Sequence, residues 1–298
     1  MLSASTSSPM LRSIARKVLP VGVRQVIRDA VNRTEELRTN WHLARFRRRY
    51  CRQKPGSVVR CFGYTVRLND GPNFFTLYKD IFIRRVYHFD AQRPDPLIVD
   101  CGSNIGMSIL YFKRSFPRAR VTGFEPDPAI FPYLQENVGR NVLQDVQLVQ
   151  AAVTRNEGTL TFYSDGKYGS CLADYLPSDL PPGYQKYIVP CVRLHDYLDE
   201  PVDFLKMNIE GAEYDVLADS ADRLRMIREM VVEYHHLPAL PRTLHDILGL
   251  LHDQGFEYLV NDFDSETNGG VRPPFRLAPE SRYYLLIYAR RLGKYEGA

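Results

Sequence analysis

Short apolar runs alternate with amphipathic stretches along the last two thirds of the chain. The apolar runs are rich in branched aliphatic residues, as is typical of strands that are buried on both faces. We therefore predict strands at 97–102, 120–126, 145–154, 202–211, 228–236, 256–260 and 283–291. Helices are predicted at 107–116, 129–141, 212–220 and 241–254, and an inserted hairpin at 158–164 and 187–194. This alternation predicts an α/β fold with a doubly wound, mostly parallel sheet and helices on both faces.

The N-terminal part of the chain has a different pattern. Residues 1–56 are predicted to be a basic, partly disordered helical extension, which is Ser-rich before it becomes helical at Leu11 and is interrupted at Pro20. After this interruption, apolar residues recur at helical spacing: Val23, Val26, Ile27, Ala30 and Val31.

A second segment, 57–94, precedes the α/β pattern. It is predicted to contain a hairpin about Gly63 and then an aromatic, helical, lid-like stretch at 74–89. Residues 95–298 are predicted to form the α/β domain.

Charge separates the extension from the rest of the chain. Residues 1–50 carry eleven Lys and Arg against three acids, a net charge of +8, whereas the whole chain is +4 and residues 51–298 are therefore −4. A general nucleic-acid binder is thus not expected. The basic helix could pack on the main domain, rest on an anionic membrane as a peripheral contact, or belong to a transit segment.

Composition narrows the class of protein. At 298 residues and 44% apolar content, the chain can bury one core, and it contains no run of about 18 apolar residues that would span a membrane. Its five cysteines are scattered and form no C-x-x-C pair, which favours a reducing compartment. We expect a cytoplasmic protein, and the sequence says nothing of its oligomeric state.

The first predicted βα turn suggests a nucleotide site. Gly102 and Gly106 are spaced G-x-x-x-G rather than G-x-G-x-x-G, and Asp100 stands two residues before the first glycine. A carboxylate there would repel a pyrophosphate but attract a ligand that carries an ammonium and a sulfonium, such as S-adenosylmethionine. Glu125 ends the next strand, 23 residues after Gly102, close to the spacing at which an acid reaches ribose hydroxyls.

Several motifs resemble those of one family. "LIVDCGSNIGMSILYF", "VTGFEPDPAIFPYLQENVGRN", "VDFLKMNIEGAEYDVL" and "VVEYHH" occur in an order similar to that of the FkbM-type S-adenosylmethionine-dependent methyltransferases. The resemblance implies a class I methyltransferase (Rossmann-like) fold, with a seven-stranded sheet whose last strand is antiparallel. It also implies methyl transfer to the oxygen of a hydroxyl group.

The same resemblance assigns cofactor-binding residues. Those expected at the methionine end of S-adenosylmethionine are Asp100, Gly102, Asn104 and Gly106. Glu125 is expected at the ribose, and Ala151 and Ala152 near the adenine. Asn208 is expected in the same site, although the family commonly has Asp at this position.

Candidate catalytic residues follow the fourth and fifth strands. Alternation places Glu233 and His235 on one face of their strand, and a carboxylate-paired histidine with a pKa near 6.5 would be a suitable general base. Glu210 lies on the turn after the fourth strand. His235 could instead be a hydrogen-bonded strand-end residue without a chemical role. A divalent metal at these strand ends is left open.

Two further residues, Tyr168 and Ser170, lie in a loop expected to cover the site.

The sequence defines the type of reaction more closely than it defines the substrate. We expect an O-methyltransferase acting on a hydroxyl of a sugar or glycoconjugate. The alternatives are a methyltransferase of a polyketide, lipid or other small natural product, or a protein that binds S-adenosylmethionine without turnover. The acceptor itself is not encoded in any motif.

Overall fold

The computed structural model of the chain describes residues 21–167, 171–172, 183–237, 241–262 and 282–291. The segments predicted to be disordered (1–10) and helical from Leu11, together with Tyr168 and Ser170, lie outside this range. The chain divides into two compact units, Met1–Arg52 and Gln53–Ala298, which are described separately.

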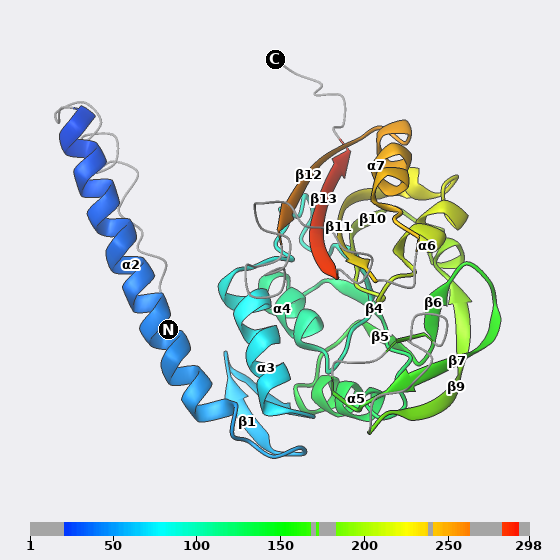
Figure 1. Cartoon of the computed structure of the whole chain (residues 1–298), viewed down its shortest axis with the longest axis horizontal. Coiled ribbons are helices and arrows are strands. Elements are labelled where there is room, and N and C mark those ends of the chain that lie inside the picture. The colour runs from blue at the N-terminus through cyan, green and yellow to red at the C-terminus, as the bar shows by residue number, and fades with distance from the viewer. Residues whose placement is uncertain (1–20, 168–170, 173–182, 238–240, 263–281, 292–298) are drawn as a thin grey trace. The chain divides into compact units, whose positions relative to one another are not determined.

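A seven-stranded sheet is the centre of the second unit (Figure 1). Its strand order is β12-β13-β11-β10-β3-β4-β5. The strands are β3 (Leu97–Cys101), β4 (Arg120–Phe124), β5 (Val146–Val149), β10 (Val202–Met207), β11 (Ile227–His236), β12 (Phe256–Asp262) and β13 (Tyr283–Arg291). β13 pairs antiparallel with both β11 and β12, while β5, β4, β3, β10 and β11 are mutually parallel. The predicted mostly parallel, seven-stranded sheet with an antiparallel last strand is confirmed.

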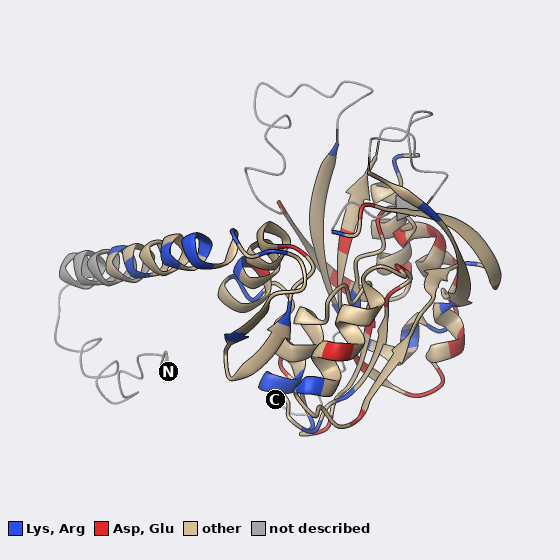
Figure 2. Ribbon diagram, turned by 90° about the horizontal axis from the view of Figure 1, so that it is seen from below, with Lys and Arg blue, Asp and Glu red and all other residues tan. Residues whose placement is uncertain are grey.

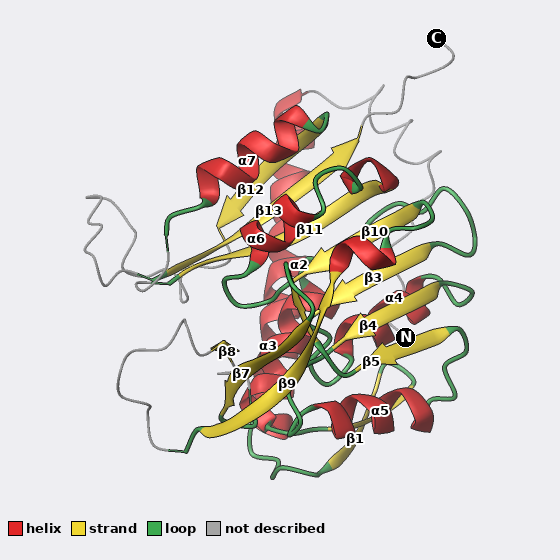
Figure 3. Ribbon diagram, turned by 90° about the vertical axis from the view of Figure 1, so that its right-hand side faces the viewer, coloured by secondary structure: helices red, strands yellow, loops and turns green. Residues whose placement is uncertain are grey.

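Helices cover both faces of this sheet (Figure 3). They are α4 (Met107–Ser115), α5 (Phe131–Arg140), α6 (Glu213–Asp219) and α7 (Leu244–Asp253), with 3₁₀ turns η3 (Leu194–Tyr197) and η4 (Leu224–Met226). On one face, Val99 and Leu205 share a buried cluster with Leu217 of α6 and Leu251 of α7.

On the opposite face, aromatic rings pack against α4. Phe204 of β10 stacks on Phe89 with 4.4 Å between ring centroids and contacts Phe112 of α4 edge-on. Because side chains alternate along a strand, Lys206 lies on the same face as Phe204. The face that carries α4 therefore also carries a buried charge.

The predicted third strand, 145–154, is in fact two strands. The chain bends at Gln150 and Ala151 and continues as β6 (Ala152–Thr154), which leaves the main sheet. β6 joins a four-stranded sheet of order β6-β9-β7-β8, with β7 (Gly158–Ser164), β8 (Cys171–Leu172) and β9 (Gln185–Arg193). The sequence pattern hid this bend, because both halves are rich in apolar residues and each half forms a strand in its own sheet.

A hairpin and a short helix precede the sheet. They are β1 (Val58–Cys61), β2 (Tyr64–Arg67), α3 (Gly71–Leu77) and a π-helical turn η1 (Tyr78–Ile83). Asn137 of α5 joins β2 at both backbone groups of Arg67, accepting from its N–H and donating to its carbonyl. Asp70 caps α3 by accepting from the N–H of Asn73 at 2.8 Å. The helix predicted at 74–89 is therefore shifted and shorter, and it ends in the π turn.

The first unit consists of one long helix in the part that the structure describes, α2 (Val21–Tyr50). Basic residues colour much of its length in Figure 2, and Arg47, Arg48 and Arg49 fill its last turn. Leu37 and Trp41, four residues apart, are 65% and 67% exposed. Within the described ranges, neither this helix nor any other is long and apolar enough to cross a membrane.

Candidate active site

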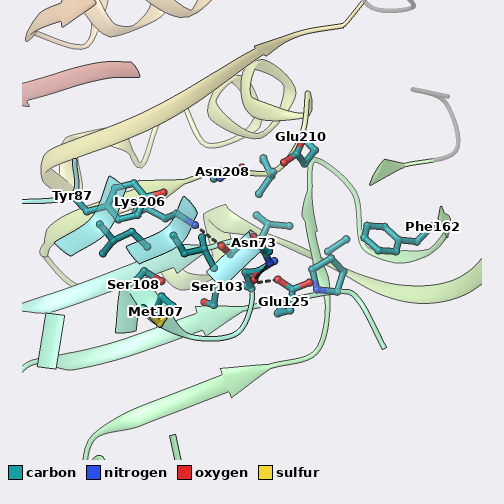
Figure 4. A pocket seen from close by; sticks show the side chains of 18 residues that line it. Asn73, Tyr87, Ser103, Met107, Ser108, Glu125, Phe162, Lys206, Asn208 and Glu210 are labelled. Atoms are coloured by element: carbon teal, nitrogen blue, oxygen red, sulfur yellow. Dashed lines mark hydrogen bonds between the residues drawn. The ribbon is translucent and has the colours of Figure 1, made fainter. Parts of the chain in front are cut away.

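A pocket with a cavity volume of about 150 Å³ lies beyond the carboxyl ends of β3, β4 and β10. Figure 4 shows Glu125 and Phe162 lining it on one side, Tyr87 and Lys206 on another, and Asn208 and Glu210 above. Ligands of doubly wound sheets bind at this edge. The pocket therefore lies where the sequence predicted the nucleotide site.

The glycine turn forms the floor of the pocket. Gly102 has a φ of 84°, and a Cβ at this position would lie 1.9 Å from the carbonyl oxygen of Asn208. Its N–H and that of Ser103 both donate to the carbonyl of Phe124. No residue with a side chain fits here, so the close approach of the two turns requires glycine.

Asn104 and Gly106 complete the turn. Asn104 has a φ of 49° and lines the pocket. Gly106 has a φ of 89°, stands at the N-cap of α4 and does not line the pocket. A Cβ there would lie 2.8 Å from the side chain of Leu134, so the glycine allows the turn to pack closely against α5.

Asp100 is completely buried and lies beneath the pocket rather than in its lining. One carboxyl oxygen lies 3.1 Å from Nζ of Lys206. The other accepts from the hydroxyls of Ser103 at 3.0 Å and Ser108 at 2.5 Å. The sequence predicted that Asp100 would line the methionine end, whereas in this structure its partners are other side chains of the protein.

Glu125 is a buried carboxylate in the pocket wall. One oxygen accepts the backbone N–H of Asn104 at 2.7 Å, and the other accepts that of Asp127 at 3.0 Å. Desolvation raises the pKa of Glu125 to about 7, against the lowering effect of these two donors. Ala152 lines the pocket on the same side, whereas its buried neighbour Ala151 does not.

Glu210 is the candidate catalytic carboxylate that reaches the pocket. It has a φ of 58°, uncommon for a residue with a side chain, and its side chain is 39% exposed. Its carboxylate lies 3.6 Å from Nε2 of His235. Desolvation raises the pKa of Glu210, and the positive charge of His235 opposes this effect.

His235 differs from the predicted general base. Its partner at Nδ1 is Glu213, at 2.9 Å, and not Glu233 as the sequence suggested. Desolvation lowers the pKa of His235, but Glu210 and Glu213 outweigh it and raise the pKa from 6.5 to about 10. The ring is therefore protonated at neutral pH, because its pKa is perturbed from the ordinary value of 6.5.

Glu233 has a separate set of partners. One oxygen accepts the hydroxyl of Tyr87, and the other accepts the side-chain amide of Asn208 at 2.7 Å. Burial raises the pKa of Glu233, and the nearby Lys206 opposes this effect. Glu233 and His235 do not line the pocket, but they contact Asn208 and Glu210, which do.

Sequence reasoning missed two of these residues as parts of the site: Tyr87 and Lys206. The lysine could have been recognised, because it is the one charged residue near the end of an otherwise apolar strand segment, "FLKM". Nothing in the sequence marked Tyr87, because it reaches the site from the segment before the sheet.

The residues present fit S-adenosylmethionine. The floor has no side chain at Gly102, so a ligand can approach the backbone closely, and Glu125 offers a carboxylate for ribose hydroxyls. For a metal ion, no group of three or more His, Cys, Asp or Glu side chains with suitable geometry occurs among the described residues.

The strand order, the antiparallel β13 and the acidic glycine-turn site define a class I S-adenosylmethionine-dependent methyltransferase. A family model described as "Methyltransferase FkbM domain" matches residues 100–258, more than half of the chain. The protein belongs to this family, as its motifs had indicated, and S-adenosylmethionine is its cofactor.

The chain is similar to several named proteins. The chain is 30% identical over 214 residues to the 31-O-demethyl-FK506 methyltransferase FkbM of Streptomyces tacrolimicus, covering 60% of this chain and 80% of that protein. It is 30% identical over 198 residues to the 2-O-methyltransferase NoeI of Sinorhizobium fredii, covering 60% and 79%. The crystal structure of the methyltransferase FkbM from Methylobacillus flagellatus aligns with a TM-score of 0.45 at 17% identity, covering 71% of this chain and 47% of that one.

Proposed function

We propose that this methyltransferase transfers a methyl group to a hydroxyl oxygen of a sugar or glycoconjugate, and that Glu210 accepts the hydroxyl proton. The observation that carries the proposal is the position of Glu210, a carboxylate in the pocket wall beside a protonated histidine. Two relatives whose names specify O-methyl transfer support oxygen as the acceptor atom.

When bound, S-adenosylmethionine supplies an electrophilic methyl carbon on a positively charged sulfur. The protein then has to orient the hydroxyl and take up its proton. We assign proton uptake to Glu210, whose raised pKa makes it a stronger base than an ordinary carboxylate. His235 keeps its own proton and positions Glu210, while Glu233 positions Asn208.

The cofactor is proposed to lie over the glycine turn. We assign the ribose hydroxyls to Glu125, the adenine side to Ala152, and the methionine end to Gly102, Asn104 and Asn208. Asp100, Gly106 and Ala151 support this site from beneath without lining it.

The acceptor side of the pocket carries both polar and apolar groups. Asn73 and Asn208 line the same pocket as Glu210 and carry amide donors and acceptors, which suits a compound with several hydroxyls. Leu77 and Ile81 line the same pocket and would also suit a polyketide, lipid or other small natural product, the second candidate. A relative named for FK506 supports this second class.

An acceptor screen with methyl-labelled S-adenosylmethionine tests the proposal. The panel contains glycolipids and oligosaccharides, polyketide and lipid alcohols, and RNA as a nucleic-acid comparison. We expect transfer to carbohydrate hydroxyls. Transfer only to polyketide or lipid alcohols would favour the second candidate. Tight cofactor binding without transfer to any acceptor would favour a binding protein.

For the whole chain, we propose residues 95–298 as the methyltransferase domain, 57–94 as a hairpin and lid-like element, and 1–56 as the N-terminal extension. Asn73, Leu77 and Ile81, which line the pocket from the second segment, support its lid-like role. We also propose a cytoplasmic protein that contacts an anionic membrane surface through α2, where Leu37 and Trp41 are exposed among arginines.

A further inference from the structure

Lys206 is a buried cation in the centre of the main sheet. It belongs to β10, all six residues of which are buried, and its side chain is only 3% exposed. A buried ammonium is costly unless it is paired and hydrogen-bonded. The groups that contact the ammonium therefore indicate the role of Lys206.

Three acceptors surround the ammonium. It donates to the carbonyl of Cys101 at 3.1 Å and to the carbonyl of Gly102, and it forms an ion pair with Asp100 at 3.1 Å. The two carbonyls accept hydrogen bonds from the ammonium, whereas Asp100 contributes its negative charge. In sheet register, Lys206 lies directly beside Asp100 on the neighbouring parallel strand, so the backbone itself sets this pairing.

The contact with Asp100 is the one that the sequence analysis assigned to the ligand. Asp100 was expected to attract the ammonium of S-adenosylmethionine, yet the ammonium next to it belongs to the protein. The remaining oxygen of Asp100 already accepts from Ser103 and Ser108. Lys206 lines the pocket, whereas Asp100 does not.

The same contacts fix the glycine turn. The carbonyl of Gly102 accepts a hydrogen bond from Lys206 of β10. At the same residue, a Cβ would lie 1.9 Å from the carbonyl oxygen of Asn208. The N–H of Asn208 in turn donates to the carbonyl of Cys101 at 3.0 Å. One lysine thus connects the buried acid, the cofactor turn and the strand that ends in Asn208.

We infer that Lys206 is a positioning residue: its ammonium takes the place beside Asp100 expected for the ammonium of S-adenosylmethionine, and holds the cofactor turn in its binding shape. Asp100 then affects cofactor affinity through Lys206 and not by contact with the ligand. The inference rests on cofactor binding and is independent of which acceptor is methylated.

Two ligands distinguish a positioning role of Lys206 from direct contact between Asp100 and the ammonium of the ligand. S-adenosylhomocysteine and 5′-methylthioadenosine share the adenosine thioether, but only the first carries the amino-acid ammonium. Calorimetry and thermal unfolding are measured for the full chain and for Lys206→Met, Asp100→Asn and the double variant. The control is Lys113→Met, which removes another buried lysine, whose Nζ donates to the carbonyl of Ala119.

We expect each single variant to weaken both ligands by a similar factor of at least tenfold, because the turn also fixes the proposed ribose carboxylate Glu125 through the N–H of Asn104, and both ligands carry the ribose. The double variant should recover Tm relative to either single variant, since it leaves no unpaired buried charge. Lys113→Met should lower Tm and leave both affinities within twofold.

Selective loss of S-adenosylhomocysteine in Asp100→Asn would overturn the inference, because Asp100 would then contact the ligand ammonium. Lower Tm with unchanged affinities in both single variants would also overturn it. If Lys206→Met does not fold, the ratio of the two affinities in Asp100→Asn still decides the question.

Discussion

His235 is held by Glu213, whose carboxylate lies 2.9 Å from its Nδ1 atom. Glu213 begins α6 and is 1% exposed, so the pair joins the end of β11 to the start of a helix inside the protein. With Nδ1 engaged, Nε2 faces Glu210 at 3.6 Å. The geometry makes the histidine a fixed positive charge behind the carboxylate that lines the pocket.

This pairing has a consequence for stability. The pKa of His235 rises from 6.5 to about 10, so its charged form stabilises the fold fully below pH 6.5, and this contribution is lost as the pH rises toward 10. We expect the free energy of unfolding to decrease from pH 6.5 to 10, and to decrease less in His235→Asn. Urea titrations at three pH values measure both slopes. Identical slopes would show that the carboxylates Glu210, Glu213 and Glu233 do not hold the ring in its charged form.

Removal of the carboxylate of Glu210 is expected to affect the rate and not the cofactor. Glu210→Gln should lower kcat by about 10²–10⁴, the usual contribution of a general base, and leave the Kd of S-adenosylmethionine within about twofold. Single-turnover kinetics and calorimetry measure the two quantities. Glu257→Gln, a change on the exposed surface of β12, is the matched control. A nearly unchanged kcat in Glu210→Gln would remove the residue from the proton path.

The binding of S-adenosylmethionine is expected to depend on pH through Glu125. Its free carboxyl has a pKa of about 7, and ribose hydroxyls donate to its ionised form, so affinity should increase from pH 6 to pH 8. Glu125→Gln should bind more weakly and lose this dependence. Calorimetry in two buffers of different ionisation enthalpy measures the proton released. The exposed Glu157→Gln should behave like the wild type, and proton uptake on binding would contradict the assignment.

Two glycines provide a test of the turn. Gly102→Ala should lower Tm and abolish cofactor binding, because its φ is 84° and the new Cβ would meet the carbonyl of Asn208. Gly139→Ala, in the last turn of α5, meets nothing within 4 Å and should raise stability by about 0.5–1 kcal/mol. Thermal unfolding and calorimetry compare the two variants. Full affinity in Gly102→Ala would mean that the turns can separate without loss.

Membrane contact through α2 is expected to require both its charge and its exposed apolar groups. The wild type should sediment with vesicles that contain phosphatidylserine and not with neutral vesicles, since arginines are attracted to anionic lipid. Trp41→Ser together with Arg45→Gln and Arg48→Gln should abolish sedimentation. Methyl transfer to a water-soluble acceptor should be unchanged. Equal sedimentation of variant and wild type would exclude this helix as the contact.

Most of the sheet could be predicted because each strand is recognisable from its own short segment of sequence. The buried strands are short segments dominated by apolar residues, and the segment "LIVDC" predicts β3 without reference to any other segment. The bend after Val149 could not be predicted in this way. Ala151 and Ala152 are both apolar, and hydrophobicity alone does not show that the first lies in a bend and the second in a strand.

The site was predictable only in part, since partners depend on register. The sequence places Glu233, His235 and Glu210 near one edge, but the pairing of His235 with Glu213 depends on where α6 begins. Similarly, the pairing of Lys206 with Asp100 becomes visible only when β10 is aligned beside β3. Proximity at a sheet edge follows from topology, whereas the choice of partner follows from packing.

The π turn η1 and the helix before it bring Asn73, Leu77 and Ile81 to the pocket from a segment that precedes every strand of the main sheet. This segment also lies outside residues 100–258, which match the family. Part of the pocket wall is therefore supplied by a segment that the family model does not cover. Substitutions at Leu77 or Ile81 would therefore change the lining of the pocket without altering any strand of the main sheet or any residue of the glycine turn.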